Sequence, residues 1–239
     1  MGKLSPVPDL IGQRHNICIK LGENILGASY RDRVHAGQVL AQQLKEIEFR
    51  TRPLVLAIPN GGVAVGAEIA RSLDADLDAI IVRKLQVPGN PEAGFGALTS
   101  QGALILNDGL VRSIGLRKEQ IDRVVEQTQA QIEKRKADYW DLVSVFSPKD
   151  TDVILVDDGI ASGYTMVAAI ESVQSIGPAS IVVAAPTCSR SAAHLVREKV
   201  NALICPRIEA GFVFAVANAY EHWYDVPDSD VLEILKEFR

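Results

Sequence analysis

Two adjacent carboxylates stand where an aliphatic run ends: Val153–Val156 is followed by Asp157 and Asp158. A turn with two glycines, Gly159–Gly163, comes next, and a helix is expected to begin near Thr165. Adjacent carboxylates are poor core residues, because unpaired buried charge is costly. At the end of a buried strand they suit ribose hydroxyls and a sugar phosphate that carries Mg²⁺. The two acids would hold the Mg²⁺ directly or through water.

The turn after the carboxylates suits a phosphate monoester. A helix N-terminus presents N–H groups without intrahelical acceptors and a partial positive charge. Glycine allows backbone angles that other residues resist, and hydroxyl groups add donors. We therefore predict an anion cradle from five consecutive residues: Ala161, Ser162, Gly163, Tyr164 and Thr165. The structural alternative is an Asp-Asp pair that only caps the next helix.

The elements that must position these residues alternate along the chain. Short aliphatic runs predict strands at Leu54–Ile58, Ala79–Val82, Val153–Val156, Ile181–Ala185 and Ala202–Ile204. Helical patterns lie between them at Arg31–Phe49, Gly62–Leu73, Leu116–Trp140, Thr165–Ile176 and Ser189–Lys199. This alternation predicts an α/β fold with a parallel twisted sheet and helices on both faces. Ligands bind such sheets at the carboxyl ends of the strands.

Two stretches break the alternation. Residues 84–102 are rich in glycine and proline, which indicates a long loop or a hairpin arm and a candidate flexible lid. The tail after residue 211 gathers aromatic residues before a last helix, with Asp228 or Ser229 as the expected cap. We predict a core domain at 31–205, with 1–30 and 206–239 forming a small hood lobe.

Composition narrows the classes of function. A net charge of −5 disfavours a nucleic-acid partner. Three cysteines without metal-ligand spacing indicate reduced, buried thiols and a cytoplasmic protein. No apolar run reaches the ~20 residues of a membrane helix, so no membrane partner is expected. His-Glu-x-x-His and Gly-x-Ser-x-Gly motifs are absent, which disfavours a zinc hydrolase and an α/β-hydrolase.

A family resemblance rests on the segment Val153–Met166. An aliphatic run, Asp-Asp, Gly-Ile-Ala-Ser-Gly, a variable residue and Thr resembles the 5-phosphoribosyl-1-pyrophosphate (PRPP) motif of class I phosphoribosyltransferases. A Walker A motif is excluded, because Tyr164 stands where that motif needs Lys. The resemblance is strongest to uncharacterised predicted members of the family, and it covers roughly residues 50–190.

The resemblance extends upstream to a second loop. Four residues are similar to the pyrophosphate loop, often Pro-Arg-Gly-Gly in these relatives: Pro59, Asn60, Gly61 and Gly62. Arg83 and Lys84, before the glycine-rich stretch, resemble the strand that leads into the lid. The resemblance implies Asp157, Asp158 and Lys84 as catalytic residues and Arg83 as a pyrophosphate ligand. It also implies Mg²⁺ held by the two acids, and we expect a homodimer.

The implied reaction transfers the 5-phosphoribosyl group from PRPP to a nitrogen of an acceptor, expected to be a nucleobase, and releases pyrophosphate. Two departures bear on it. Asn60 replaces the Arg of the loop, and only Arg binds phosphate bidentately with charge. Ala161 stands where 6-oxopurine enzymes carry an acid, which argues against that acceptor class. The alternatives are a PRPP- or nucleotide-binding regulator with little turnover, favoured by Asn60, and a PRPP synthetase-like enzyme, disfavoured by the short chain.

Overall fold

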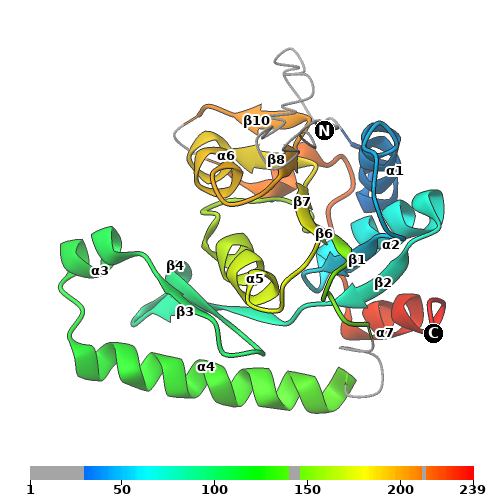
Figure 1. Cartoon of the computed structure of the whole chain (residues 1–239). Helices are drawn as coiled ribbons and strands as arrows, with labels where there is room; N and C mark the ends of the chain where they lie inside the picture. The colour runs from blue at the N-terminus through cyan, green and yellow to red at the C-terminus, as the bar shows by residue number, and fades with distance from the viewer. Residues whose placement is uncertain (1–29, 140–145, 212–213) are drawn as a thin grey trace, which may run out of the picture.

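The computed structural model describes residues 30–139, 146–211 and 214–239. Its centre is a sheet of five parallel strands in the order β2-β1-β6-β7-β9 (Figure 1). The strands are β1 (Leu54–Ala57), β2 (Asp76–Ala79), β6 (Asp152–Val156), β7 (Ser180–Ala184) and β9 (Ala202–Ile204). From β1 the chain continues to β2 on one side of the sheet, and from β6 it continues through β7 to β9 on the other side. The order therefore reverses between β1 and β6, and ligands of open α/β sheets bind at such a point.

Both faces of the sheet are covered by helices, as the aliphatic strands require. Successive side chains alternate between two apolar layers: Val55 and Ala57 belong to one, Leu54 and Leu56 to the other. The first layer contains α1 (Arg33–Leu44), α2 (Gly61–Leu73) and α7 (Asp228–Lys236). The second contains α5 (Tyr164–Gln174) and α6 (Arg190–Arg197). The predicted fold class is confirmed.

Four of the five predicted strands are confirmed, and the second was placed wrongly. That strand is Asp76–Ala79, in register with β1 from Leu54 to Ala57. The aliphatic run 79–82 misled the prediction, because β2 contains the charged residue Asp78. Asp78 is fully buried and accepts hydrogen bonds from the backbone N–H of Phe146 and from the Arg239 guanidinium. This pairing makes a charge tolerable inside the sheet.

Two possibilities were predicted for the glycine-rich stretch, a long loop or a hairpin arm, and the structure shows the hairpin arm. It forms an antiparallel sheet of β3 (Val82–Val87), β4 (Asn90–Thr99) and β5 (Leu104–Leu106), followed by α3 (Asp108–Ile114) and α4 (Lys118–Tyr139). The arm projects beyond the central sheet (Figure 1). Glycine indicated a loop here because its packing role is invisible in sequence. A Cβ on Gly96 would lie 2.3 Å from the Ile105 carbonyl oxygen, so glycine allows β5 to pair.

The end of the chain returns to the sheet. β8 (Thr187–Ser189) pairs with β10 (Arg207–Glu209), and a 3-10 turn, η2 (Val216–Ala219), follows. α7 begins at Asp228 with Pro227 as its N-cap, one residue before the predicted caps. Val231 and Leu235 of α7 are buried in the same apolar layer as α2. The division into a core and a hood lobe stays a prediction, and residues 1–29 of that lobe lie outside the described residues.

Two sequence expectations about single features can be compared with this fold. Cys188 and Cys205 are buried, as predicted, whereas Cys18 lies outside the described residues. Within the described part of the chain, none of the helices combines the length and the apolar character needed to cross a membrane.

Candidate active site

The candidate site lies at the carboxyl edge of β1 and β6. The backbone N–H of Ile58 donates to the carbonyl of Val156 at 2.8 Å, so the two strands end side by side. The chain leaving β1 enters the loop Pro59–Gly62, and the chain leaving β6 enters Asp157–Thr165. The two loops that the sequence singled out therefore meet at the point where strand order reverses.

The acid pair is partly buried, and its two carboxyl groups differ in their surroundings. The backbone N–H of Asp158 donates to Oδ1 of Asp157 at 2.8 Å. Burial and the neighbouring charge of Asp158 raise the pKa of Asp157 well above its usual range. Asp158 instead has a cation beside it: Nε of Arg33 lies 2.8 Å from its Oδ2.

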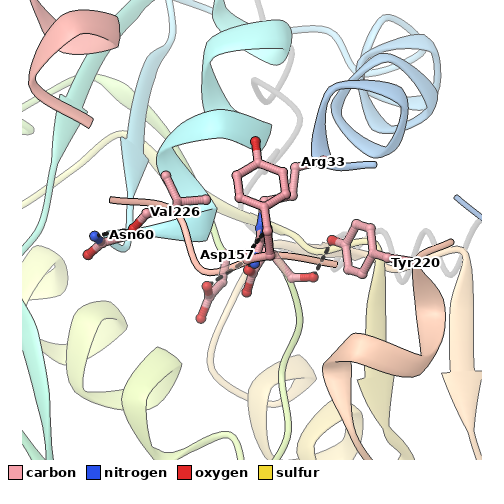
Figure 2. A network of polar contacts seen from close by, with 7 residues as sticks. Arg33, Asn60, Asp157, Tyr220 and Val226 are labelled. Atoms are coloured by element: carbon pink, nitrogen blue, oxygen red, sulfur yellow. Dashed lines mark hydrogen bonds and ion pairs between the residues drawn. The ribbon is translucent and has the colours of Figure 1, made fainter. Parts of the chain in front are cut away.

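Arg33 is the site residue that sequence reasoning missed. It occupies the first turn of α1, and only 4% of its side chain is exposed. Its guanidinium carbon lies 4.1 Å from the ring centroid of Trp223, and Nη1 donates to the carbonyl of Tyr224 at 2.7 Å. Figure 2 shows Arg33 between α1 and the acid pair. No local motif links residues 33 and 158, so only the fold reveals this contact.

Aromatic residues of the tail close over this ion pair. The hydroxyl of Tyr220 donates to the carbonyl of Asp158 at 2.6 Å (Figure 2). Burial, and then the charge of Asp158, raise the pKa of Tyr220, so the hydroxyl remains a donor. Trp223 and Tyr224 are 40% and 51% exposed. They cover the buried cation on one side and offer ring surface to solvent on the other.

The predicted cradle opens α5. Gly163 precedes the helix with φ of 86° and makes no side-chain cap, so the first turn of α5 keeps its N–H groups available. Ala161 and Ser162 are exposed, while Tyr164 and Thr165 are half-buried. The turn is anchored from below, because Ser189 Oγ donates to the carbonyl of Ala161 at 2.6 Å. The turn is therefore tied to Ser189, while Ala161 and Ser162 remain exposed.

Gly61 and Gly62 press directly against the acids. A Cβ on Gly61 would lie 1.8 Å from Oδ2 of Asp158, and one on Gly62 would lie 3.1 Å from Cα of Asp157. Glycine is required at these positions by close approach and not by backbone angle. The acid pair, Arg33 and the glycine loop therefore form one packed unit.

The side chain of Asn60 is bound within the protein. Its Nδ2 donates at 2.7 Å to the carbonyl of Val226 and at 2.7 Å to Oδ1 of Asp228, and its Oδ1 accepts from Arg135 of α4. The Pro59–Asn60 peptide bond is cis. Figure 2 shows Asn60 reaching toward Val226. The loop is thus fastened to α4 and to the segment before α7, and its backbone, not the Asn60 amide, is what it can offer a ligand.

The other two predicted residues lie in the arm. Arg83 is half-buried and Lys84 is exposed, and both belong to β3. Lys84 lines a groove of about 280 Å³ between β3 and α4, and Arg123 lines it too. The residues lining this groove include neither the acids nor the cradle. The structure brings Asp157, Asp158, the cradle and the glycine loop together, whereas Arg83 and Lys84 stand on a separate element.

Comparisons with known proteins agree with this geometry. The family model described as "Phosphoribosyl transferase domain" matches residues 31–221. The chain is 32% identical over 206 residues to "Putative phosphoribosyl transferase Rv0571c" of Mycobacterium tuberculosis strain H37Rv, and equally to "Putative phosphoribosyl transferase MT0597" of strain CDC 1551. Each match covers 86% of this chain and 46% of the relative, so the chain spans less than half the length of these curated relatives.

A solved structure is similar over most of its length. The crystal structure of TT1426 from Thermus thermophilus aligns with a TM-score of 0.73 and 35% sequence identity. The alignment covers 87% of this chain and 98% of that one. The chain belongs to the phosphoribosyl transferase domain family.

Proposed function

We propose that the protein is a phosphoribosyltransferase that transfers the 5-phosphoribosyl group of PRPP to a nitrogen of a nucleobase-like acceptor. One observation carries the proposal: an acid pair and a helix N-terminus without a side-chain cap lie beside a glycine loop at the reversal point of the sheet. An acid pair suits ribose hydroxyls, and helix amides suit a phosphate.

Each part of the site has a role in this reaction. The bond from the ribose anomeric carbon to pyrophosphate breaks, the acceptor nitrogen bonds to that carbon, and the nitrogen loses its proton. Positive charge develops on the ribose, so positioning and electrostatics supply most of the rate. The cradle Ala161–Thr165 would hold the 5-phosphate and Asp157 the ribose hydroxyls. The backbone of Gly61–Gly62 would face the pyrophosphate, and we keep Arg83 and Lys84 as arm residues that reach it when PRPP is bound.

The site fits Mg²⁺ only together with the substrate. Across the described residues, no group of three or more His, Cys, Asp or Glu side chains could hold a metal ion. Mg²⁺ is commonly bound by one or two carboxylates plus substrate phosphates and water. Asp157 and Asp158 would supply the carboxylates, directly or through water. When bound, Mg²⁺ would neutralise charge on the departing pyrophosphate.

Two features suggest what the acceptor is. Trp223 and Tyr224 expose ring surface beside the acid pair, and flat rings favour stacking on a planar base. Ala161 has no carboxylate for acid–base work on a purine, which favours an acceptor outside the 6-oxopurines. A cytoplasmic homodimer completes the proposal. The three cysteines, sparse and without metal-ligand spacing, suit a reducing compartment.

The second candidate function is a PRPP- or nucleotide-binding regulator. The contacts of Asn60 favour it, because they tie the side chain of the pyrophosphate loop to Val226 and Asp228. A loop held in this way offers pyrophosphate no side-chain cation.

The test is pyrophosphate release from PRPP with Mg²⁺, measured against a panel of purine and pyrimidine bases. The enzyme predicts release with one acceptor class, and the regulator predicts PRPP binding without release. Asp157→Asn in the same assay controls for spontaneous hydrolysis. Both functions would be contradicted if the protein neither bound PRPP nor released pyrophosphate from it.

A further inference from the structure

We propose that Arg33 is a positioning residue of this site: it holds the Asp158 carboxylate in place, so that Asp157 is the acid that contacts the ribose directly and Asp158 acts on Mg²⁺ only through water. The inference rests on the proposed function and adds a residue from α1. Arg33 itself is excluded from direct ligand contact, because its side chain is 4% exposed beneath Trp223.

The geometry fixes Asp158 from three sides. Arg33 Nε holds its Oδ2 at 2.8 Å, Gly61 leaves no room for a Cβ above that oxygen, and Tyr220 binds its carbonyl at 2.6 Å. A carboxylate held this way cannot swing toward a substrate without leaving a buried guanidinium without its partner, which is strongly unfavourable. Among the described residues, Asp157 has no ion-pair partner within 4.0 Å. The two acids, adjacent in sequence, therefore have different tasks.

Arg33 also joins the acid pair to the aromatic tail. Its Nη1 donates to the Tyr224 carbonyl, and its guanidinium stacks on Trp223. The residues proposed to meet the acceptor and those proposed to meet the ribose thus share one buried cation. Loss of Arg33 should loosen both ends of the site, whereas loss of a surface arginine should loosen neither.

The experiment is a double-mutant cycle read by calorimetry with PRPP and Mg²⁺. Arg33→Gln should weaken PRPP binding about tenfold, since two close carboxylates are left without their cation. In an Asp158→Asn background the same change should cost less than about twofold, because the charge that Arg33 cancels is gone. Equal losses in both backgrounds would overturn the positioning role.

Further variants keep the test sharp. Arg33→Lys retains the charge and should recover part of the affinity, which also answers the case in which Arg33→Gln fails to fold. The pKa of Asp157, followed by carboxyl NMR, should rise in Arg33→Gln and return toward the wild-type value in Arg33→Lys. Identical titration in the two variants would contradict the proposal.

Arg71→Gln is the matched control. Arg71 bridges Glu68 and Glu237 at the far end of α2, so PRPP affinity should not change. Absence of PRPP binding in the wild type would reject the proposed function itself. Wild-type binding that Arg33→Gln leaves unaltered would reject only the role of Arg33.

Discussion

The two loops at the reversal point are built alike, but they differ in exposure and in the contacts of their side chains. Each follows a buried parallel strand and opens a helix: Pro59–Gly62 leads into α2, and Ala161–Thr165 into α5. The α5 loop exposes Ala161 and Ser162 and has no side-chain cap. The α2 loop has its Asn60 side chain bound to three partners and its glycines packed on the acids.

The two loops differ in accessibility, and a helix N-terminus can bind a ligand only where its N–H groups are accessible. At α5 the anchoring contact comes from Ser189 and goes to the Ala161 carbonyl, so it uses none of the N–H groups of the turn. At α2 the contacts of Asn60 secure the loop to α4 and to the tail. We therefore propose that the turn before α5 binds the 5-phosphate of PRPP, whereas the loop before α2 positions the acids.

The largest effect is expected where the α2 loop touches the acids. Gly61→Ala would place a Cβ 1.8 Å from Oδ2 of Asp158 and 2.7 Å from Nε of Arg33. Repacking should cost about 3 kcal/mol, because the clash lies inside a packed unit. Chemical denaturation measures this loss, and PRPP binding should disappear with it.

The control for that change is Gly109→Ala on α3. A Cβ there meets only the Asn107 side chain, at an ordinary 3.5 Å, so stability should stay the same or rise slightly. Equal stability of the two variants would show that the α2 loop yields easily, and the contrast between the loops would lose its basis.

The next effect separates the sequence expectation from the structure. By sequence alone, Asn60→Arg should strengthen pyrophosphate binding by adding a bidentate cation. The contacts predict otherwise: the change removes the bond to Val226 and places a second guanidinium beside Arg135. We expect a loss of about 2 kcal/mol in the free energy of unfolding and no gain in pyrophosphate affinity.

Asn218→Ala is the control for Asn60→Arg. Asn218 is exposed in η2, so its replacement should change stability by less than about 0.5 kcal/mol. Tighter pyrophosphate binding by Asn60→Arg would restore the expectation drawn from the sequence.

Much of this site was predictable because its signals are local. A strand, two acids, a glycine turn and a helix are contiguous in Val153–Thr165, so their chemistry can be inferred from spacing. The contacts of Arg33 and Asn60 are not, since their partners are distant in sequence and only the topology brings them together. For the arm, the sequence could not decide between a loop and a hairpin for another reason: the glycines that let β4 approach β5 look the same in a sequence as the glycines of a loop.

The acid pair should make the stability of the folded protein depend on pH. Burial and Asp158 raise the pKa of Asp157, so the folded protein holds a proton that the unfolded chain releases. Stability should therefore fall as pH rises from about 4, the ordinary carboxyl pKa, through the raised value. Asp157→Asn should flatten this slope and raise the stability of the ligand-free protein at pH 7, which chemical denaturation at several pH values would measure.

Substitution of the acids should weaken ligand binding, in contrast to its expected stabilising effect on the ligand-free protein. Asp157→Asn with Asp158→Asn should weaken Mg²⁺-dependent PRPP binding at least about tenfold, roughly 1.4 kcal/mol, because both charges are gone and the size is kept. Unchanged affinity in calorimetry would leave the acids with a structural role alone.

The smallest effect is expected at the exposed turn. Ser162→Ala removes one hydroxyl from the cradle and leaves its backbone in place, since the turn is anchored through Ala161 and Ser189. Affinity for PRPP should fall by about 1 kcal/mol, the contribution of one hydrogen bond, with no change in stability. Ser113→Ala on α3, exposed and bonded only to the Leu110 carbonyl, should leave affinity unaltered. If Ser162→Ala instead destabilised the protein without affecting PRPP binding, the α5 loop would be a structural turn like the α2 loop, and the phosphate would have to bind elsewhere.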